Sequence, residues 1–210
     1  MTKWEFNQSV ASNFVDYAKK HIPNYDQVID LSIDVCKKTN QSAKIVDIGC
    51  ATGETLRRLN AAGFKNLYGV DSSQAMLDMC PAIATYIQSE AYPKSLTHID
   101  IAIMNWTLHF IKDKDSYLLN IFKNLNPKGI LILSDKVSLD PYAIECYHKF
   151  KASHGVSKKE IIEKEQQIKD VMFINDTEWY LTKLKNLGFE KVFLVNAHWC
   201  FNTFVCIKGN

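Results

Sequence analysis

Three acidic residues lie within or directly after short apolar segments of the chain. Asp47 lies within segment 44–48, Asp71 follows segment 67–70, and Glu90 follows segment 85–88. Parallel strands would bring the ends of these segments to one edge of a sheet. An acid after the second strand can accept both hydroxyls of a ribose, and an acid one strand further out can accept an adenine amino group. We therefore expect a nucleoside to bind across these strand ends.

Two glycines, Gly49 and Gly53, flank the turn that follows the first apolar segment, in KIVDIGCATGETL (44–56). Glycine lets the backbone turn tightly and approach a ligand. The helix after the turn would direct its free N–H groups and its positive dipole end at that ligand. A dinucleotide site needs G-x-G-x-x-G, and Ala51 stands where its second glycine would be. The spacing favours S-adenosylmethionine, which has no pyrophosphate, and leaves a dinucleotide oxidoreductase as the weaker alternative.

Two polar side chains follow the apolar segment 99–104. The Asn105 amide would hold the methionine end of the cofactor or a substrate, or simply form a turn. His109 has the chemistry of a general base, although we prefer a role in packing or hydrogen bonding under a helical cap. The sequence therefore assigns no catalytic residue.

The chain between these residues alternates between strand and helix patterns. Alternation with short connections predicts an α/β Rossmann-like fold with a doubly wound, mostly parallel, seven-stranded sheet. The expected helices lie over 53–62, 73–80 and 115–125, and a further helix starts at Asp176; the expected strands lie over 45–48, 67–70, 85–88, 99–104, 129–134, 192–195 and 201–207.

The remaining helical segments predict an N-terminal arm and a cap. Pro23 separates the arm helices expected over 8–20 and 24–38, and the arm either packs on the sheet or closes over the pocket. Cap helices are expected over 142–152 and 157–170. We expect a single domain made of four parts: arm 1–40, cofactor-binding core 41–140, cap 141–175, and C-terminal helix with closing strands 176–210.

The composition is that of an ordinary globular protein, with 47% hydrophobic residues in 210 and a net charge of +2. This charge gives no strong attraction to nucleic acid or membrane, so neither is an expected partner. The N-terminus lacks the apolar core of a signal peptide, which predicts a cytoplasmic protein. None of the six cysteines forms a C-x-x-C pair, so we expect reduced thiols and no metal site.

Motifs along nearly the whole chain resemble those of a known enzyme family. VDIGCATG (46–53) and GVDSSQAML (69–77) resemble class I S-adenosylmethionine-dependent methyltransferases. Four further segments are similar to the carboxy-S-adenosylmethionine synthase family: FNQSVASNF (6–14), NWTLHF (105–110), LNPKGILILSDK (125–136) and residues 147–190. That family makes carboxy-S-adenosylmethionine from S-adenosylmethionine and prephenate for tRNA wobble-uridine modification. The resemblance implies a homodimer and S-adenosylmethionine as cofactor, with contacts from Tyr25, Gly49, Cys50, Ala51, Asp71, Ser72, Glu90, Ala91 and Asn105.

One residue departs from that family. The family places an arginine in a cap helix to bind the extra carboxylate, and Glu165 falls at that position when 147–190 is aligned without gaps. The chain has only two arginines, Arg57 and Arg58, and neither is in the cap. Losing one charge-assisted contact costs about 1.5–3 kcal/mol. A facing glutamate adds repulsion, so carboxylate binding should be weaker by roughly a thousandfold. Lys164 is expected to lie on another side of the helix.

We therefore interpret the chain as an S-adenosylmethionine-dependent methyltransferase that acts on an unidentified small-molecule acceptor. Methyl transfer from a sulfonium needs mainly in-line positioning, which explains why no catalytic pair stands out in the sequence. The alternatives are a true carboxy-S-adenosylmethionine synthase and a non-catalytic protein that binds S-adenosylmethionine.

Overall fold

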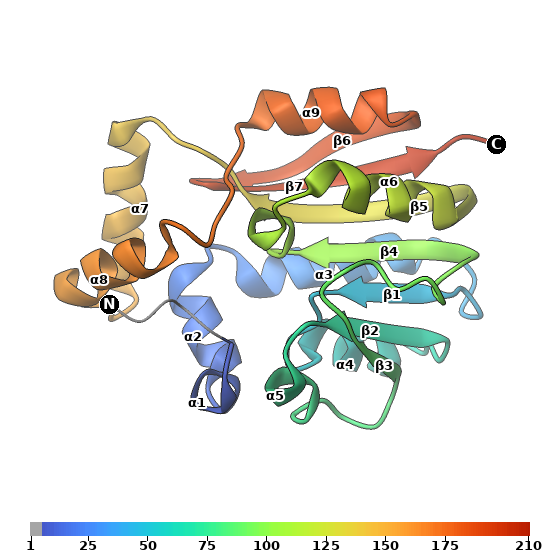
Figure 1. The fold of residues 1–210 in the computed structure, drawn as a ribbon, viewed down its shortest axis with the longest axis horizontal. Coiled ribbons are helices and arrows are strands. Elements are labelled where there is room, and N and C mark those ends of the chain that lie inside the picture. The colour runs from blue at the N-terminus through green and yellow to red at the C-terminus, as the bar shows by residue number, and fades with distance from the viewer. Residues whose placement is uncertain (1–5) are drawn as a thin grey trace.

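The computed structural model describes residues 6–210, and it contains a seven-stranded sheet with strand order β3-β2-β1-β4-β5-β7-β6 (Figure 1). Neighbouring strands from β3 to β5 run parallel, whereas β7 runs antiparallel to both β5 and β6. This confirms the predicted Rossmann-like fold. The strands are β1 (Ile45–Ile48), β2 (Leu67–Asp71), β3 (Thr85–Gln88), β4 (Ile99–Asn105), β5 (Leu125–Lys136), β6 (Phe189–His198) and β7 (Phe201–Lys208).

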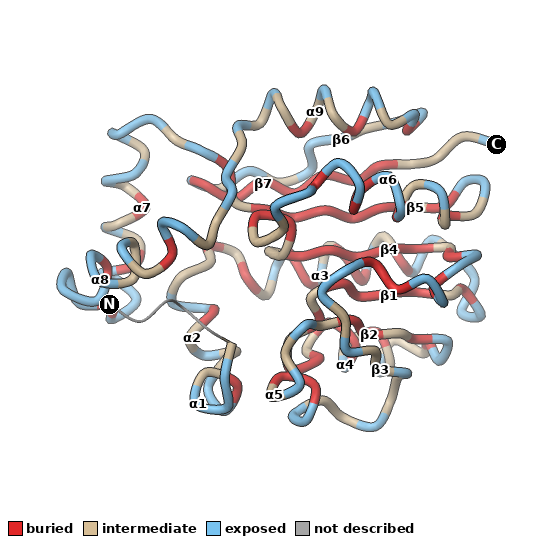
Figure 2. Tube along the Cα trace, viewed as in Figure 1, coloured by how far each residue is buried: buried red, intermediate tan, exposed pale blue. Residues whose placement is uncertain are grey.

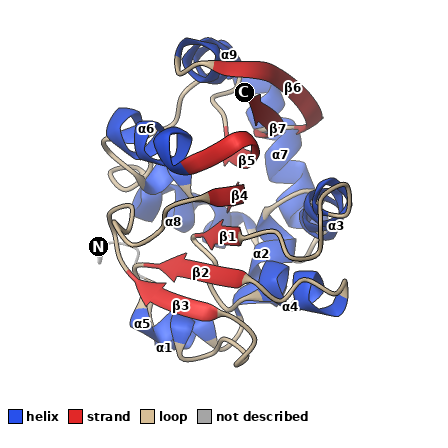
Figure 3. Ribbon diagram, turned by 90° about the vertical axis from the view of Figure 1, so that its right-hand side faces the viewer, coloured by secondary structure: helices blue, strands red, loops and turns tan. Residues whose placement is uncertain are grey.

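Helices cover both faces of the sheet (Figure 3). One face packs against α6 and α9 through Tyr117, Ile121 and Tyr180, and the other packs against α3 and α4 through Ile29 and Leu56. Because both faces are covered, β1 and β4 are apolar at adjacent positions. These helices are α3 (Tyr25–Cys36), α4 (Glu54–Ala61), α6 (Lys114–Asn124) and α9 (Thr177–Asn186).

The arm and the cap lie beyond the carboxyl ends of β1 and β4, on the left in Figure 1. They contribute α1 (Gln8–Ala11) and α2 (Phe14–His21) from the arm, and α7 (Pro141–Ser153) and α8 (Lys158–Ile168) from the cap. The short helices α5 (Gln74–Leu77) and η1 (Leu108–Phe110) follow β2 and β4 at the same edge. Open α/β sheets bind ligands at this edge.

Several expected elements have other bounds in the structure, including the helix expected over 73–80, which ends at Leu77. The single helix expected over 8–20 is wrong, because α1 ends at Ala11 and α2 starts at Phe14. Between them the Ser12 hydroxyl donates to the Ser9 carbonyl (3.0 Å), and serine and asparagine compete in this way with helical hydrogen bonds.

The strand expected over 129–134 starts earlier, at Leu125, because Leu125 pairs with Ile99 before a register shift around Pro127. The closing strand β6 is also longer than the expected 192–195, because β7 pairs with it from Phe189 to His198. Figure 2 shows β4, β5 and β7 buried along most of their length, whereas β6 at the edge of the sheet is largely exposed. Within residues 6–210, no helix has both the length and the apolar character that crossing a membrane requires.

Candidate functional site

A cavity of about 910 Å³ lies at the carboxyl ends of β1, β2 and β4 and extends beneath the arm and the cap. Ligand pockets in proteins typically measure about 300–1,000 Å³, so this cavity has room for more than a small fragment. The arm contributes Phe14, Tyr17 and His21 to its wall, and Ala18 of the same arm packs in the core, so both expected roles of the arm are present. All of the residues that the resemblance implies as cofactor contacts line it: Tyr25, Gly49, Cys50, Ala51, Asp71, Ser72, Glu90, Ala91 and Asn105.

The turn after β1 depends on its glycines. Gly49 and Gly53 have φ of +72° and +80°, and Ala51 between them also has a positive φ, +46°. A Cβ on Gly49 would lie 1.9 Å from Thr107 Oγ1. The Gly49 N–H donates to the Val70 carbonyl at 2.7 Å, which ties the turn to β2. The backbone of this turn can therefore approach a ligand closely, and only glycine fits at position 49.

The Asp71 carboxylate joins the turn to the end of β2. Its Oδ2 accepts from the Ala51 N–H and its Oδ1 accepts from the Ser73 N–H, both at 2.9 Å. Burial raises the pKa of Asp71, and these backbone N–H groups oppose that rise. A carboxylate has about four lone-pair sites. Asp71 can therefore hold the turn and still accept hydrogen bonds from two ligand hydroxyls.

Asp47 is a second buried acid that lines the cavity, and it is only 2% exposed. Burial and the nearby Asp71 raise its pKa to about 7, against a hydrogen bond from Thr55. A cation in the cavity would favour the ionised form of this acid. The unusual position of an acid inside an apolar strand is visible in the sequence, but its contribution to the cavity wall is not.

Ser72, Glu90 and Ala91 form an exposed rim at the β2–β3 side of the cavity. The Ser89 hydroxyl donates to the Ala91 carbonyl (2.7 Å), and the Ser89 N–H donates to the Asp71 carbonyl (2.9 Å). The rim is thus tied to the end of β2, while its outer side faces solvent.

The Asn105 amide is buried at the end of β4, and neither its Nδ2 nor its Oδ1 bonds a described residue. A buried polar atom without a partner costs about 1–3 kcal/mol. An amide offers both a donor and an acceptor, and the methionine end of S-adenosylmethionine carries both a carboxylate and an ammonium. This orphaned amide therefore fits that cofactor.

An aromatic wall stands next to Asn105. Tyr25 stacks on Trp106 with ring centroids 4.7 Å apart and planes at 19°. Trp106 has a positive φ of +57°, and its backbone N–H donates to the Ser134 carbonyl at 2.6 Å. The sequence alone does not identify Trp106 as a wall residue, because a tryptophan after an apolar strand carries no pattern that separates a pocket wall from core packing.

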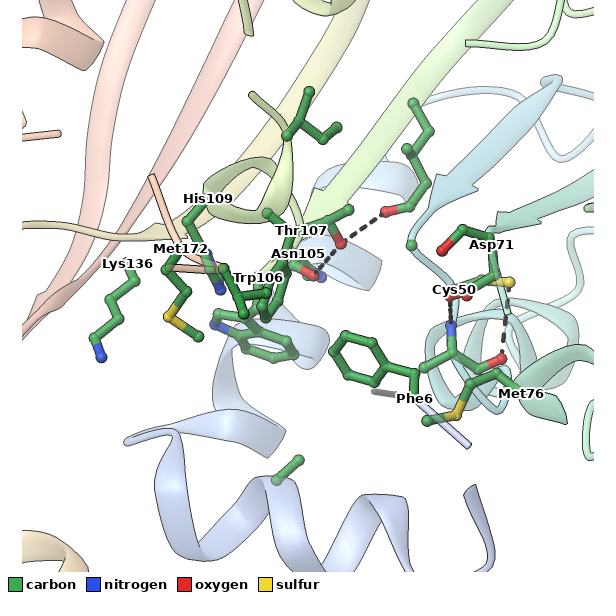
Figure 4. A pocket seen from close by; sticks show the side chains of 18 of the residues that line it. Phe6, Cys50, Asp71, Met76, Asn105, Trp106, Thr107, His109, Lys136 and Met172 are labelled. Carbon is green, nitrogen blue, oxygen red and sulfur yellow. Dashed lines mark hydrogen bonds between the residues drawn. The ribbon is translucent and has the colours of Figure 1, made fainter. Parts of the chain in front are cut away.

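His109 both hydrogen-bonds and lines the cavity. Its side chain is 4% exposed, and its Nδ1 bonds Asp135 Oδ1. In Figure 4 it lies near Trp106 and Met172, on the far side of Asn105 from Asp71. The expected packing role is therefore only part of what the structure shows for this residue.

The cap end of the cavity is lined by Lys136, Lys151, Lys164 and Glu165. Glu165 Oε1 accepts from His148 Nε2 and from Lys151 Nζ, the latter at 3.2 Å. Burial and, to a smaller extent, the nearby Lys136 together lower the pKa of Lys164 to about 6. Burial also lowers the pKa of Lys151, although Glu165 opposes this.

This arrangement corrects two expectations about the cap. Glu165 is an ion-paired residue rather than an isolated acid, so it would repel an anion less than a bare glutamate. Lys164 does not lie on another side of the helix, because α8 borders the cavity along its edge and both neighbours face it. An entering anion would favour the charged forms of the lysines.

No group of three or more His, Cys, Asp and Glu side chains in residues 6–210 is arranged to hold a metal ion. All six cysteines are free thiols. Cys50 in the glycine-rich turn is buried, and the thiol of the neighbouring Cys80 donates to the Ala51 carbonyl at 3.2 Å.

Comparisons with known proteins agree with this geometry. A family model described as a methyltransferase domain matches residues 20–172. The carboxy-S-adenosyl-L-methionine synthase of Helicobacter hepaticus is 32% identical over 227 residues, covering 98% of this chain and 95% of its own length. The synthase of Alteromonas mediterranea is 29% identical, with 98% and 93% covered.

Solved structures show the same fold. The magnesium protoporphyrin IX methyltransferase of Synechocystis PCC 6803, with bound S-adenosylhomocysteine, has a TM-score of 0.65 at 14% identity, covering 91% of this chain and 86% of its own. An S-adenosylmethionine-dependent methyltransferase of Mesorhizobium loti has a TM-score of 0.60 at 17% identity, covering 86% and 100%.

The family model matches more than half of the chain, and the Helicobacter relative covers nearly all of it. This chain therefore belongs to the S-adenosyl-L-methionine-dependent methyltransferase family, in the group that includes the Helicobacter hepaticus carboxy-S-adenosyl-L-methionine synthase, and it is a transferase that uses S-adenosyl-L-methionine.

Proposed function

We propose that this protein transfers a methyl group from S-adenosylmethionine to a small acceptor that carries an anionic group. The observation that supports this most is one cavity that runs from Asp71 at the nucleoside end to Lys151 at the cap end. Bound S-adenosylmethionine supplies an electrophilic methyl group on a sulfonium. The chain's own residues then have to bind the two reactants, align them and exclude water.

The cofactor would occupy the end of the cavity formed by β1, β2 and β4. In this proposal Asp71 accepts the ribose hydroxyls, and Asn105 bonds the methionine end at the glycine-rich turn of Gly49, Cys50 and Ala51. The adenine lies at the exposed rim of Ser72, Glu90 and Ala91, and Tyr25 covers the cofactor from the arm.

The acceptor would occupy the cap end. Lys136, Lys151 and Lys164 outnumber Glu165 there, and Glu165 is already paired with both His148 and Lys151. Partly desolvated lysines regain favourable charge interactions when a carboxylate or phosphate binds beside them. We therefore infer that the acceptor carries such an acid group in addition to the atom that is methylated.

A second candidate is carboxy-S-adenosylmethionine synthesis. Full-length relatives carry that name, and the lysines at the cap end can also face the carboxylate of a carboxylated cofactor. Lysine is a point charge, whereas arginine binds a carboxylate through two parallel hydrogen bonds. The absence of an arginine from the cap makes this candidate the second rather than the first.

Two measurements on the full-length protein test the proposal. Calorimetry would compare S-adenosylmethionine with its carboxylated form, and we expect no tighter binding of the latter. Binding of the carboxylated form that is tighter by more than about tenfold, or about 1.4 kcal/mol, would favour the synthase instead. The second measurement is release of S-adenosylhomocysteine in the presence of small carboxylic and phosphoric acids that also carry a hydroxyl, amino or thiol group.

A matched pair of lysine variants locates the acceptor. Lys164→Met should lower acceptor-dependent turnover and leave the affinity for S-adenosylhomocysteine within about twofold, because this lysine lies at the cap end. Lys158→Met, on the exposed side of the same helix, is the control. Cofactor binding without turnover of any acid would support a non-catalytic binding protein and contradict the proposal.

We also propose a homodimer, a cytoplasmic location and the four-part division of the single domain at 40, 140 and 175. The edge strand β6 exposes Phe193, Leu194 and Val195 at 48%, 44% and 42%, which is a surface that a second copy would cover. Free cysteines suit a reducing compartment. Light scattering would measure the mass in solution: we expect a dimer for the wild type and a monomer for Leu194→Lys. A wild-type monomer would contradict the proposed dimer.

A further inference from the structure

The topology of the sheet brings two titratable residues together beside the cavity. β4 and β5 are parallel neighbours, with Asn105 paired to Ser134 at their carboxyl ends. His109 follows Asn105 in the short helix η1, and Asp135 follows Ser134 directly. The two side chains therefore meet at the edge of the sheet where the cavity opens.

The Asp135 side chain is fully buried, and its carboxylate accepts hydrogen bonds at both oxygens. Oδ1 accepts from the His109 backbone N–H (3.3 Å) and bonds the ring Nδ1, while Oδ2 accepts from the Tyr180 hydroxyl. Carboxylate oxygens of an ionised aspartate act only as acceptors. This set of partners indicates that Nδ1 carries the proton and donates it to Asp135.

With Nδ1 protonated, a neutral imidazole has its lone pair on Nε2. No described residue hydrogen-bonds Nε2 of His109, and the residue lines the cavity. The ring is held by its Nδ1 bond to Asp135, and the backbone of His109 is fixed because the Phe173 N–H donates to the His109 carbonyl at 2.7 Å. The arrangement presents a fixed basic nitrogen to the contents of the cavity.

The position of His109 suits the acceptor rather than the nucleoside. Asp71 and Asn105 belong to the cofactor end in the proposed function, and Lys136 belongs to the cap end. Figure 4 shows His109 with Met172 and Lys136 on the side of Asn105 that is away from Asp71. A base here would act on the reactant that receives the methyl group.

We propose that His109 is the general base of this enzyme, that Asp135 is its positioning residue, and that the acceptor atom therefore carries a proton, as an O–H, N–H or S–H group. This inference rests on the proposed methyl transfer. A lone pair on the acceptor atom forms the new bond to the methyl carbon, and the carbon–sulfur bond breaks to leave a neutral thioether. The acceptor proton moves to Nε2, and Asp135 stabilises the resulting imidazolium until it loses the proton to water.

The first test needs no acceptor. Nitrogen-15 NMR of the histidine rings in the full chain at pH 8 would identify the His109 signal by its loss in His109→Asn. We expect the Nδ1–H tautomer in the wild type and a shift toward the Nε2–H tautomer in Asp135→Asn, whose amide no longer serves as a carboxylate acceptor. An Nε2–H tautomer in the wild type would overturn the inference, because Nε2 would then have no lone pair for the acceptor proton.

The second test uses turnover with an acid from the acceptor panel. His109→Asn keeps a donor near Asp135 but removes the base, so kcat should fall by about a hundredfold or more while the Kd of S-adenosylhomocysteine changes little. His98→Asn is the matched control, since His98 is exposed, lies away from the cavity and has a positive φ of +54° that asparagine tolerates. Thermal unfolding would show that both variants fold.

The pH profile separates a base from a structural histidine. The kcat of a reaction that uses a general base falls at low pH, and His109→Asn should lose this acid limb. The titratable groups that face His109 or its partner are Asp135 on β5, Lys114 on α6 and Tyr180 on α9. Lys136 on β5 lines the same cavity.

These tests distinguish a wrong role for His109 from a wrong proposed function. Unchanged turnover or an unchanged acid limb in His109→Asn would overturn the role of His109 while leaving methyl transfer intact. A wild type that methylates no acid in the panel would contradict the proposed function. The tautomer measurement would still decide whether His109 and Asp135 form the pair described.

Discussion

The backbone N–H of Ala51 donates a 2.9 Å hydrogen bond to Asp71 Oδ2, which joins the glycine-rich turn after β1 to the end of β2. The same carboxylate is placed to accept ribose hydroxyls in the proposed site. In the proposed site this one side chain both shapes the turn and binds the ligand, so its removal should affect both.

Asp71→Ala should weaken S-adenosylhomocysteine binding by roughly tenfold or more, because charge-assisted hydrogen bonds contribute about 1.5–3 kcal/mol. Calorimetry measures this. Asp78→Ala is the control, since Asp78 is exposed at the end of α5 and its carboxylate accepts a hydrogen bond from the Gln74 side chain, away from the turn. Equal affinity in wild type and Asp71→Ala would show that the nucleoside binds elsewhere.

Gly49→Ala should abolish measurable cofactor binding and lower the melting temperature. The added Cβ would lie 1.9 Å from Thr107 Oγ1 at a φ of +72°, so both the turn and the loop after β4 would have to move. Gly155→Ala separates the two causes, because Gly155 has a similar φ of +83° but nothing within 4 Å of the added Cβ. If the two variants bind and melt alike, contact with Thr107 does not restrict the turn.

Asp47 should make the folded protein less stable as the pH rises from about 4 to about 7. Its pKa is 3.8 in a model compound and about 7 in the folded protein, so between these values the folded state holds a proton that the unfolded state has lost. Stability falls wherever the folded state binds more protons, here by at most about 4 kcal/mol at pH 8.

Asp47→Asn should remove this contribution and be more stable than wild type at pH 8, with the advantage shrinking toward pH 4. Urea unfolding at several pH values measures the difference, and Asp34→Asn on an exposed helix surface is the control. A constant difference between Asp47→Asn and wild type across this range would mean that Asp47 does not titrate there.

Glu165→Arg should raise the affinity for the carboxylated cofactor by about tenfold, since a planar guanidinium can bind a carboxylate through two hydrogen bonds. The substitution also releases Lys151 from its ion pair. Glu163→Arg, on the exposed surface of the same helix, shows the effect of charge alone. Equal gains in the two variants, or no gain in either, would mean that residue 165 does not face the carboxylate position.

The sequence predicts the sheet and the cofactor end well because short-range patterns encode them. Strong apolar segments specify β1 and β4, and Gly49 with Asp71 marks the turn and its partner. All of the cofactor residues implied by the resemblance line one cavity, although whether they bind the cofactor stays a prediction.

The acceptor end was less predictable, because it depends on contacts between distant segments. His109 and Asp135 are 26 residues apart, and the structure joins them only through the pairing of β4 with β5. Lys136, Lys151 and Lys164 come from three different elements. Their convergence follows from where the cap lies on the sheet, which no local pattern encodes.

Mass spectrometry of the ligand that copurifies with the full-length wild-type protein tests the central claim most directly. Methyl transfer predicts S-adenosylmethionine or S-adenosylhomocysteine in the cavity. Carboxy-S-adenosylmethionine as the bound form would contradict that account and make the protein a synthase like its full-length relatives.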